Sequence, residues 1–204
     1  MENCGPSDNQ SNGNFRVVPI AGRQLIERFI KVPWLLYKDD PCWVPPLVFE
    51  RKWHLSAKNP YFEHADFQAW IACRGERVVG RISAQVDRLH LEQYHDSTGF
   101  FWLLEAEDDS ETFRALFEAA EGWLRHKGMQ RIRGPFNLSI NDECGLLIDG
   151  FDSPPPIMLG HALPYYQLRV EEQGYRKEQD LLAYRAHPDI PPPKHFEALA
   201  RRAG

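Results

Sequence analysis

The sequence predicts a mixed α/β fold in which helices flank a mostly antiparallel sheet. Two extended runs, residues 67–74 and 77–86, are separated by a Gly-Glu pair, a spacing that favours a tight hairpin. A continuous apolar run at 98–104 lacks polar alternation, so it predicts a strand that is covered on both faces. Apolar side chains recur at helical spacing between residues 108 and 128. These three features indicate a sheet with at least one packed helix.

The composition is that of a globular protein with one or two domains. The chain has 204 residues, of which 43% are hydrophobic and 26% charged. Its 24 Lys and Arg against 29 Asp and Glu give a net charge of -5, which argues against a dedicated nucleic-acid binder. The longest apolar run, residues 100–104, is far shorter than the roughly 20 residues that span a bilayer. We therefore predict no membrane span and a cytoplasmic location.

Neither cysteines nor histidines form a metal-binding motif. The four cysteines stand at positions 4, 42, 73 and 144, too far apart for a C-x-x-C pair, and we interpret them as free thiols. His90 and His95 are five residues apart, whereas a helical metal pair requires a spacing of four. We predict no metal.

The amino-terminal part predicts a tail, a strand and two helices. Residues 1–14 have no aliphatic or aromatic side chain after Met1, so we predict a disordered tail. Residues 15–20 predict a strand, which Pro19 places at a sheet edge or strand end. Apolar residues at helical spacing follow, and Pro33 predicts the end of this helix or the start of a second short one.

Turn and cap residues define the other elements. Residues 39–47 hold three prolines and predict an extended connector that Trp43 and Val44 attach to the core. Asp109 or Ser110 is the expected cap of the long helix, and Gly128 can close it. Further predictions are a strand over 131–136, a helix over 164–173 that ends at Gly174, and a last strand over 181–185. Residues 187–204 read as a proline-containing linker and the start of a possible further domain.

This order of elements resembles the GNAT superfamily of acyl-CoA-dependent N-acyltransferases. The segments DDPCWVPPL, VVGRISAQV, GPFNLSINDECGLLIDGF and PYYQLRVEEQGYRK are similar to an uncharacterised group of bacterial GNAT-like proteins, which often carry a second acyltransferase-type domain. The resemblance covers residues 15–186 and implies one domain with a GNAT-like, mixed and mostly antiparallel sheet flanked by helices.

The resemblance also implies acyl-CoA as co-substrate. Its pantetheine arm would lie between the strands at 98–104 and 131–136 and contact their backbone. The expected contacts are Phe101, Trp102, Leu103 and Leu104.

Two positions depart from the family pattern. The pyrophosphate loop R/Q-x-x-G-x-G/A offers backbone N–H groups at a helix start, but residues 105–110 read EAEDDS, whose four acids repel a pyrophosphate. A tyrosine often serves as general acid four residues before the last helix's glycine, where this chain has Val170. Tyr165 and Tyr166 lie one turn earlier.

A dense polar cluster follows the strand that is predicted to end at Phe136. Acyl transfer to an amine needs a base, donors to an oxyanion and an acid for the thiolate. We assign Glu143 as the candidate base and Tyr166 as the candidate acid, both catalytic. The alternative is that the cluster only satisfies backbone groups in a long turn. The candidate substrate-binding residues are Asn137, Ser139, Asn141 and Asp142.

Two functions are consistent with these features. The first is an acyl-CoA-dependent N-acyltransferase that acts on a small amine or amino acid. The second is a non-catalytic GNAT-like half that supports a neighbouring catalytic domain. The expected partner is accordingly a small-molecule amine or a second GNAT-like domain. The second function predicts an exposed apolar patch on this chain.

Overall fold

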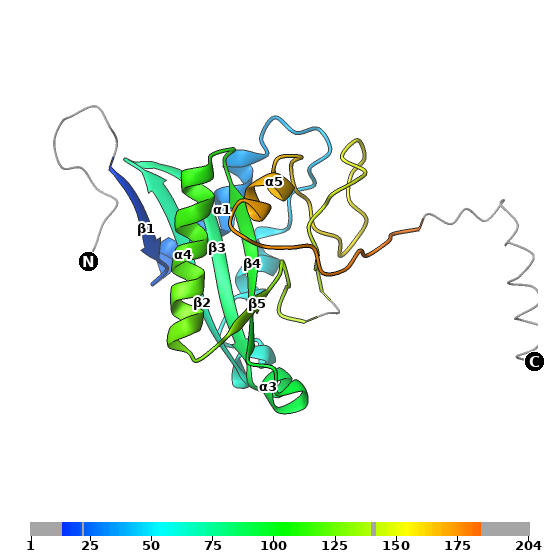
Figure 1. Ribbon diagram of the computed structural model, residues 1–204. Helices are drawn as coiled ribbons and strands as arrows, with labels where there is room; N and C mark the ends of the chain where they lie inside the picture. The colour runs from blue at the N-terminus through cyan, green and yellow to red at the C-terminus, as the bar shows by residue number, and fades with distance from the viewer. Residues whose placement is uncertain (1–13, 22, 140–141, 185–204) are drawn as a thin grey trace, which may run out of the picture.

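The computed structural model describes residues 14–21, 23–139 and 142–184 and contains a five-stranded sheet in its centre (Figure 1). The strands lie in their order along the chain, and all neighbours are antiparallel except β4 and β5, which are parallel. The predicted mixed, mostly antiparallel sheet flanked by helices is confirmed. The strands are β1 (Phe15–Pro19), β2 (Ala65–Arg74), β3 (Arg77–Asp87), β4 (Thr98–Ala106) and β5 (Arg131–Arg133).

Helices cover both faces of the sheet (Figure 1). The long helix α4 packs on one face with its apolar stripe, and α1 packs on the other. No helix in the described ranges is long and apolar enough to cross a membrane. The helices are α1 (Arg23–Leu36), α2 (Val48–His54), the 3₁₀ turn η1 (Pro60–Glu63), α3 (Arg88–Tyr94), α4 (Ser110–His126) and α5 (Tyr166–Glu171).

The predicted hairpin is formed by β2 and β3. Gly75 has a φ of +64°, which a residue without Cβ adopts at no steric cost. Side chains of β2 alternate between the faces: Ile71 packs on the α1 side, and Trp70 and Ala72 on the α4 side. The sheet therefore has two apolar layers, one under each helix.

Strand β4 is buried along almost its whole length, as predicted, and it carries a bulge. Arg81 of β3 pairs with Glu105, but Ser83 pairs with Trp102, so β4 has one extra residue there. Leu103 has a φ of +46°, and Trp102 and Leu103 both pack on the α1 side although they are neighbours. The bulge thus shifts the alternation of side chains in the second half of β4.

The prediction that Pro33 ends the first helix is wrong, because α1 continues through it to Leu36. A proline inside a helix has no N–H for the carbonyl four residues earlier, here that of Phe29. In this fold Arg81 Nη1 donates to that carbonyl oxygen at 2.8 Å. A partner distant in sequence therefore replaces the bond that the helix lacks.

Helix α4 begins and ends as predicted. Asp109 is its N-cap and accepts a hydrogen bond from Thr112 N at 2.9 Å. Gly128, with a φ of +84°, follows its last turn. The apolar face of α4 is buried on the sheet.

Two strand predictions need correction. β5 ends at Arg133 instead of residue 136, since Pro135 has no N–H to donate to a ladder. Residues 181–184 form no strand and pair with no strand of the sheet. α5 confirms the helix within 164–173, and Gly174, with a φ of +87°, follows it.

The connector at 39–47 contains no helix or strand, as predicted. Trp43 packs edge-on against Trp34 at 5.3 Å, but Val44 is exposed and does not attach the segment to the core. Cys42, Cys73 and Cys144 form no disulfide. The predicted tail at 1–13, the linker at 187–204 and Cys4 lie outside the described residues.

Candidate functional site

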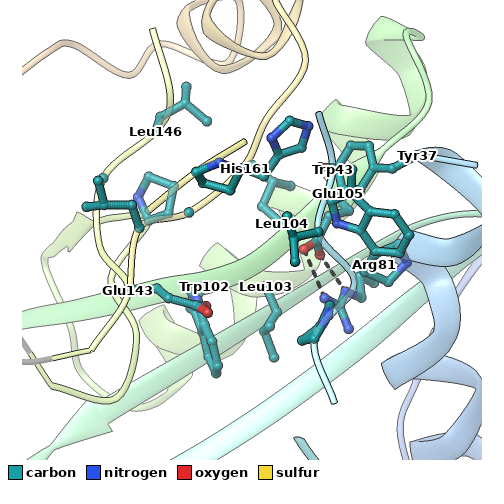
Figure 2. A pocket seen from close by; sticks show the side chains of 18 of the residues that line it. Tyr37, Trp43, Arg81, Trp102, Leu103, Leu104, Glu105, Glu143, Leu146 and His161 are labelled. Atoms are coloured by element: carbon teal, nitrogen blue, oxygen red, sulfur yellow. Dashed lines mark hydrogen bonds and ion pairs between the residues drawn. The ribbon is translucent and has the colours of Figure 1, made fainter. Parts of the chain in front are cut away.

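A cavity of about 120 Å³ lies beside β4, at the point where β5 leaves it. Its walls come from the C-terminal end of α1, the connector, the start of α2, the bulged part of β4 and the segment from Pro135 to His161. Figure 2 shows Trp43, Tyr37 and His161 toward one end and Glu143 beside Trp102 toward the other. Segments more than 100 residues apart thus meet in one site.

The divergence of β4 and β5 forms this cavity. Their ladder joins residues 98–100 to 131–133, and Phe136 N then donates to Phe101 O at 2.9 Å. Beyond this point the chain turns away from β4. Three of the four predicted acyl-CoA contacts, Trp102, Leu103 and Leu104, line the cavity. Phe101 does not line it, since its ring is buried on the α4 side against Phe117.

A buried ion pair forms part of the wall. Arg81 donates through Nη2 to Glu105 Oε1 at 2.9 Å and through Nε to Glu105 Oε2. Only 5% of the Arg81 side chain is exposed. The guanidinium also donates to the Phe29 carbonyl oxygen. Its charge is therefore compensated by Glu105, and its N–H groups have acceptors on Glu105 and Phe29. This pair connects β3, β4 and α1.

A second ion pair joins α2 to the predicted polar cluster. Arg51 Nη2 donates to Glu143 Oε1, and the Arg51 guanidinium lies 5.5 Å from the centre of the Trp102 ring. Glu143, the predicted base, therefore lines the cavity with one carboxylate oxygen bound to arginine.

A histidine and a carboxylate form a third pair at the opposite end. His161 Nε2 lies 2.8 Å from Asp40 Oδ2, and the His161 ring packs edge-on against Tyr37 at 5.2 Å. The His161 side chain is 7% exposed, and its Nδ1 is buried without a hydrogen-bond partner among the described residues. Burial favours protonation of Asp40, but hydrogen bonds from Cys42 N and His161 outweigh it and lower the pKa of this carboxyl.

Tyr166, the predicted acid, lies behind the cavity wall. Its hydroxyl accepts a hydrogen bond from Ala106 N at 2.9 Å and shares another with the Tyr37 hydroxyl at 3.0 Å. Burial raises the pKa of Tyr37 and of Tyr166 well above the usual value. Tyr37 lines the cavity and Tyr166 does not, so the predicted acid is one hydrogen bond away from the site.

Most of the predicted substrate-binding residues form a turn. Ser139 Oγ donates to Asp142 Oδ2 at 3.0 Å, and the buried Asn137 accepts from Leu138 N at 2.7 Å. Asn137, Ser139 and Asp142 do not line the cavity. Asn141 lies outside the described residues.

The start of α4 does not fit a pyrophosphate. The Asp109 carboxylate accepts from Thr112 N and Thr112 Oγ1, so it occupies one of the helix N–H groups that a phosphate would need and places a negative charge there. Arginines bind the surrounding acids: Arg74 contacts Asp109 at 2.9 Å, and Arg169 contacts Asp108 at 2.7 Å. The acidic loop is thus an internally paired cap.

Two exposed apolar side chains belong to the cavity wall. Val44 of the connector and Leu159 of the opposite wall both line the cavity and are exposed. Leu47 and Phe49 follow Val44 in the chain, and Ile157 precedes Leu159. All three are exposed as well, Ile157 by 94%. We call these five residues the apolar rim. The second functional hypothesis predicts a contiguous exposed apolar patch, of which these residues would be candidates.

The His161–Asp40 pair and the two arginines of the cavity wall, Arg51 and Arg81, were not predicted from the sequence. These residues carry no local motif, and His161 and Asp40 are 121 positions apart. Only the segment DDPCW contained a signal, since Asp40 precedes Pro41 and its carboxylate accepts from Cys42 N in a turn.

Comparison with known proteins finds no matching family model. The chain is 52% identical over 159 residues to Protein YghO of Escherichia coli (strain K12), which covers 78% of this chain and 41% of YghO. It is 48% identical over 185 residues to the bacterial ceramide synthase of Caulobacter vibrioides, which covers 89% of this chain and 48% of that protein. The chain therefore spans less than half the length of each of these two relatives.

A solved aminoglycoside acetyltransferase, meta-AAC0020 from an uncultured soil metagenomic sample, aligns with 85% of this chain and 95% of its own at a TM-score of 0.47 and 12% identity. By sequence, the chain is a relative of one region of YghO and of the bacterial ceramide synthase, and this region has the mixed α/β fold described above.

Proposed function

We propose that the chain belongs to an N-acyltransferase that transfers a fatty acyl group from acyl-CoA to the amino group of a long-chain amine. The observation that carries the proposal is the cavity at the divergence of β4 and β5. It brings ionisable side chains next to a buried strand, and its wall includes Val44 and Leu159 of the apolar rim. Amide formation from a thioester requires a proton acceptor and donors to the oxyanion in such a water-poor place.

A long-chain acceptor fits better than the small amine or amino acid expected from the sequence. The cavity itself has room only for the reacting groups, whereas Val44, Phe49 and Ile157 offer exposed apolar surface outside it. Burying a methylene group contributes about 0.8 kcal/mol, so an alkyl chain on this surface would add affinity. The 48% identity to a ceramide synthase supports an acceptor of the same kind, an amine with a long alkyl chain.

The nucleotide end of the coenzyme does not fit the start of α4. Asp109 fills the phosphate position and Glu107 and Asp108 surround it, each paired with an arginine. We therefore propose that this chain holds the acyl thioester and the amine, and that α4 makes no contact with the pyrophosphate.

A second candidate function is a non-catalytic half that supports another domain. The start of α4 favours this second function, because its Asp109 cap and acidic residues leave no site for a phosphate. The apolar rim is the surface that a neighbouring domain would cover.

The test is amide synthesis by the protein as its gene encodes it. Palmitoyl-CoA and sphinganine are supplied together, and the N-acyl product is measured by mass spectrometry. We expect product with sphinganine and much less with ethanolamine, which lacks the alkyl chain. Palmitoyl-pantetheine, which lacks the nucleotide, is expected to serve nearly as well as palmitoyl-CoA if α4 makes no phosphate contact.

Matched variants connect the activity to the cavity. Leu146→Trp places a bulky indole in the cavity wall and should abolish turnover by filling the cavity. Leu168→Trp, on the exposed face of α5, should leave turnover unchanged. Absence of product from the unmodified protein with any acyl-CoA would instead favour the non-catalytic half.

A further inference from the structure

We propose that His161 Nδ1, oriented by Asp40, accepts the proton of the acceptor's ammonium group. This inference rests on the proposed function and names the proton acceptor of that site. Its structural basis is a buried imidazole in the cavity wall with one nitrogen bound to a carboxylate and the other without a partner among the described residues.

The pairing determines which nitrogen carries the proton. The Asp40 carboxylate only accepts hydrogen bonds, so Nε2, at 2.8 Å from it, must be the protonated nitrogen. Nδ1 of the neutral ring then has a lone pair. Cys42 N donates to the other Asp40 oxygen at 2.9 Å and fixes the carboxylate. Histidines in acyl-transfer enzymes are commonly oriented by a carboxylate in this way.

Other candidates in the cavity are already engaged. Arg51 binds a Glu143 carboxylate oxygen, and Arg81 binds both oxygens of Glu105. Tyr37 has a raised pKa caused mainly by burial, so it remains protonated. Of the ionisable groups that line the cavity, His161 alone has a buried nitrogen without a described partner. The charged groups around it are Asp40, Arg51, Arg81, Glu105 and Glu143, with Tyr37 in ring contact.

The resulting reaction balances. Nδ1 takes one proton from the ammonium, and the neutral amine attacks the thioester carbonyl. The C–N bond forms and the C–S bond breaks with its electron pair on sulfur. The nitrogen loses its surplus proton to the thiolate, which yields amide and CoA thiol, and the imidazolium releases its proton to solvent.

The test uses His161→Gln in the amide-synthesis assay with palmitoyl-CoA and sphinganine. The glutamine amide can still donate to Asp40 but offers no basic nitrogen. We expect kcat to fall by about 10²- to 10⁴-fold with little change in the KM for the amine. His64→Gln is the matched control: His64 pairs with Asp87 at 2.9 Å outside the cavity, and its loss should leave turnover unchanged.

Two further readouts separate a proton acceptor from a structural residue. The decline of kcat at acidic pH should be present in the unmodified protein and absent from the residual activity of His161→Gln. Asp40→Asn should lower kcat in a folded protein, because an amide N–H donating to Nε2 moves the ring proton to Nδ1. Long-range ¹H–¹⁵N spectra of the unmodified protein should show the proton on Nε2.

The outcomes distinguish the two proposals. Unmodified protein that makes no amide would overturn the proposed function. Unmodified protein that is active, together with a His161→Gln variant of equal kcat, would overturn only the inference on His161. A proton on Nδ1 at neutral pH would overturn it as well, whatever the activity.

Discussion

The guanidinium of Arg81 donates to the carbonyl oxygen of Phe29 at 2.8 Å and so satisfies the acceptor that Pro33 leaves without a helical partner. Three elements depend on this contact: α1, which continues through the proline, and β3 and β4, which the same guanidinium joins through Glu105. Stability and cavity shape are therefore coupled at one side chain.

Arg81→Met should lower the free energy of unfolding by about 3–5 kcal/mol, since it leaves a buried carboxylate and a buried carbonyl unpaired. Urea denaturation measures this. In a Pro33→Ala background the cost of Arg81→Met should be smaller by roughly 1 kcal/mol, because residue 33 can then donate to Phe29 O. Strict additivity of the two substitutions would contradict this account.

Stability should fall steeply at alkaline pH. Burial raises the pKa of five of the seven tyrosines, that of Tyr165 to about 12. Above pH 10 the unfolded chain loses these protons while the folded chain keeps them, so each tyrosine removes about 1.4 kcal/mol per pH unit. Urea unfolding at pH 9 and pH 11 tests this, with Tyr166→Phe as a variant that reduces the slope. A slope unaffected by this change would exclude Tyr166 as a contributor.

Gly134→Ala should be destabilising by about 1–3 kcal/mol or more. A Cβ at Gly134 would lie 2.5 Å from the backbone oxygen of Phe101, which cannot move without disturbing β4. Gly122, on the exposed side of α4, has no atom within 4 Å of its Cβ position. Gly122→Ala should therefore stabilise by about 0.5–1 kcal/mol. Thermal unfolding of the two variants tests this. A Tm that shifts in the same direction for both would refute the packing argument.

Asp109→Ala should cost about 0.5–2 kcal/mol at neutral pH, as loss of a helix cap does. Burial opposes ionisation of Asp109, but hydrogen bonds from Thr112 and the charge of Arg74 outweigh it and lower the pKa. The contribution is thus present above the unfolded value near 3.8 and disappears as pH falls through the lower folded value. The difference from the unmodified protein should vanish near pH 2, and the exposed Asp149→Ala should show no such difference at pH 7.

Elements with strong local signals could be predicted from the sequence. The hairpin at Gly75, the buried strand β4 and the capped helix α4 each depend on residues close together in the chain. The helices α2 and α3 were not predicted: each has only seven residues, and none of these is buried. The interpretation of Pro33 is wrong because the compensating donor, Arg81, is 48 residues away.

The candidate site was predictable only in part. Glu143, inferred from the polar cluster, and residues 102–104, implied by the family resemblance, do line the cavity. His161 and Asp40 come together through loops whose course depends on packing of Trp43 and Tyr37, for which no spacing rule exists.

The extra residue in β4 reverses which face of the sheet the following side chains point to. Unbroken alternation from Trp102 through Leu103 would place Glu105 on the α4 side, away from Arg81; with the bulge, the carboxylate lies on the same side as the guanidinium. Deleting Leu103 would restore regular alternation after Trp102 and keep residues 104–106 on their present sides, whereas one residue inserted after Leu103 would invert them as a block and turn a carboxylate into the apolar layer under α4.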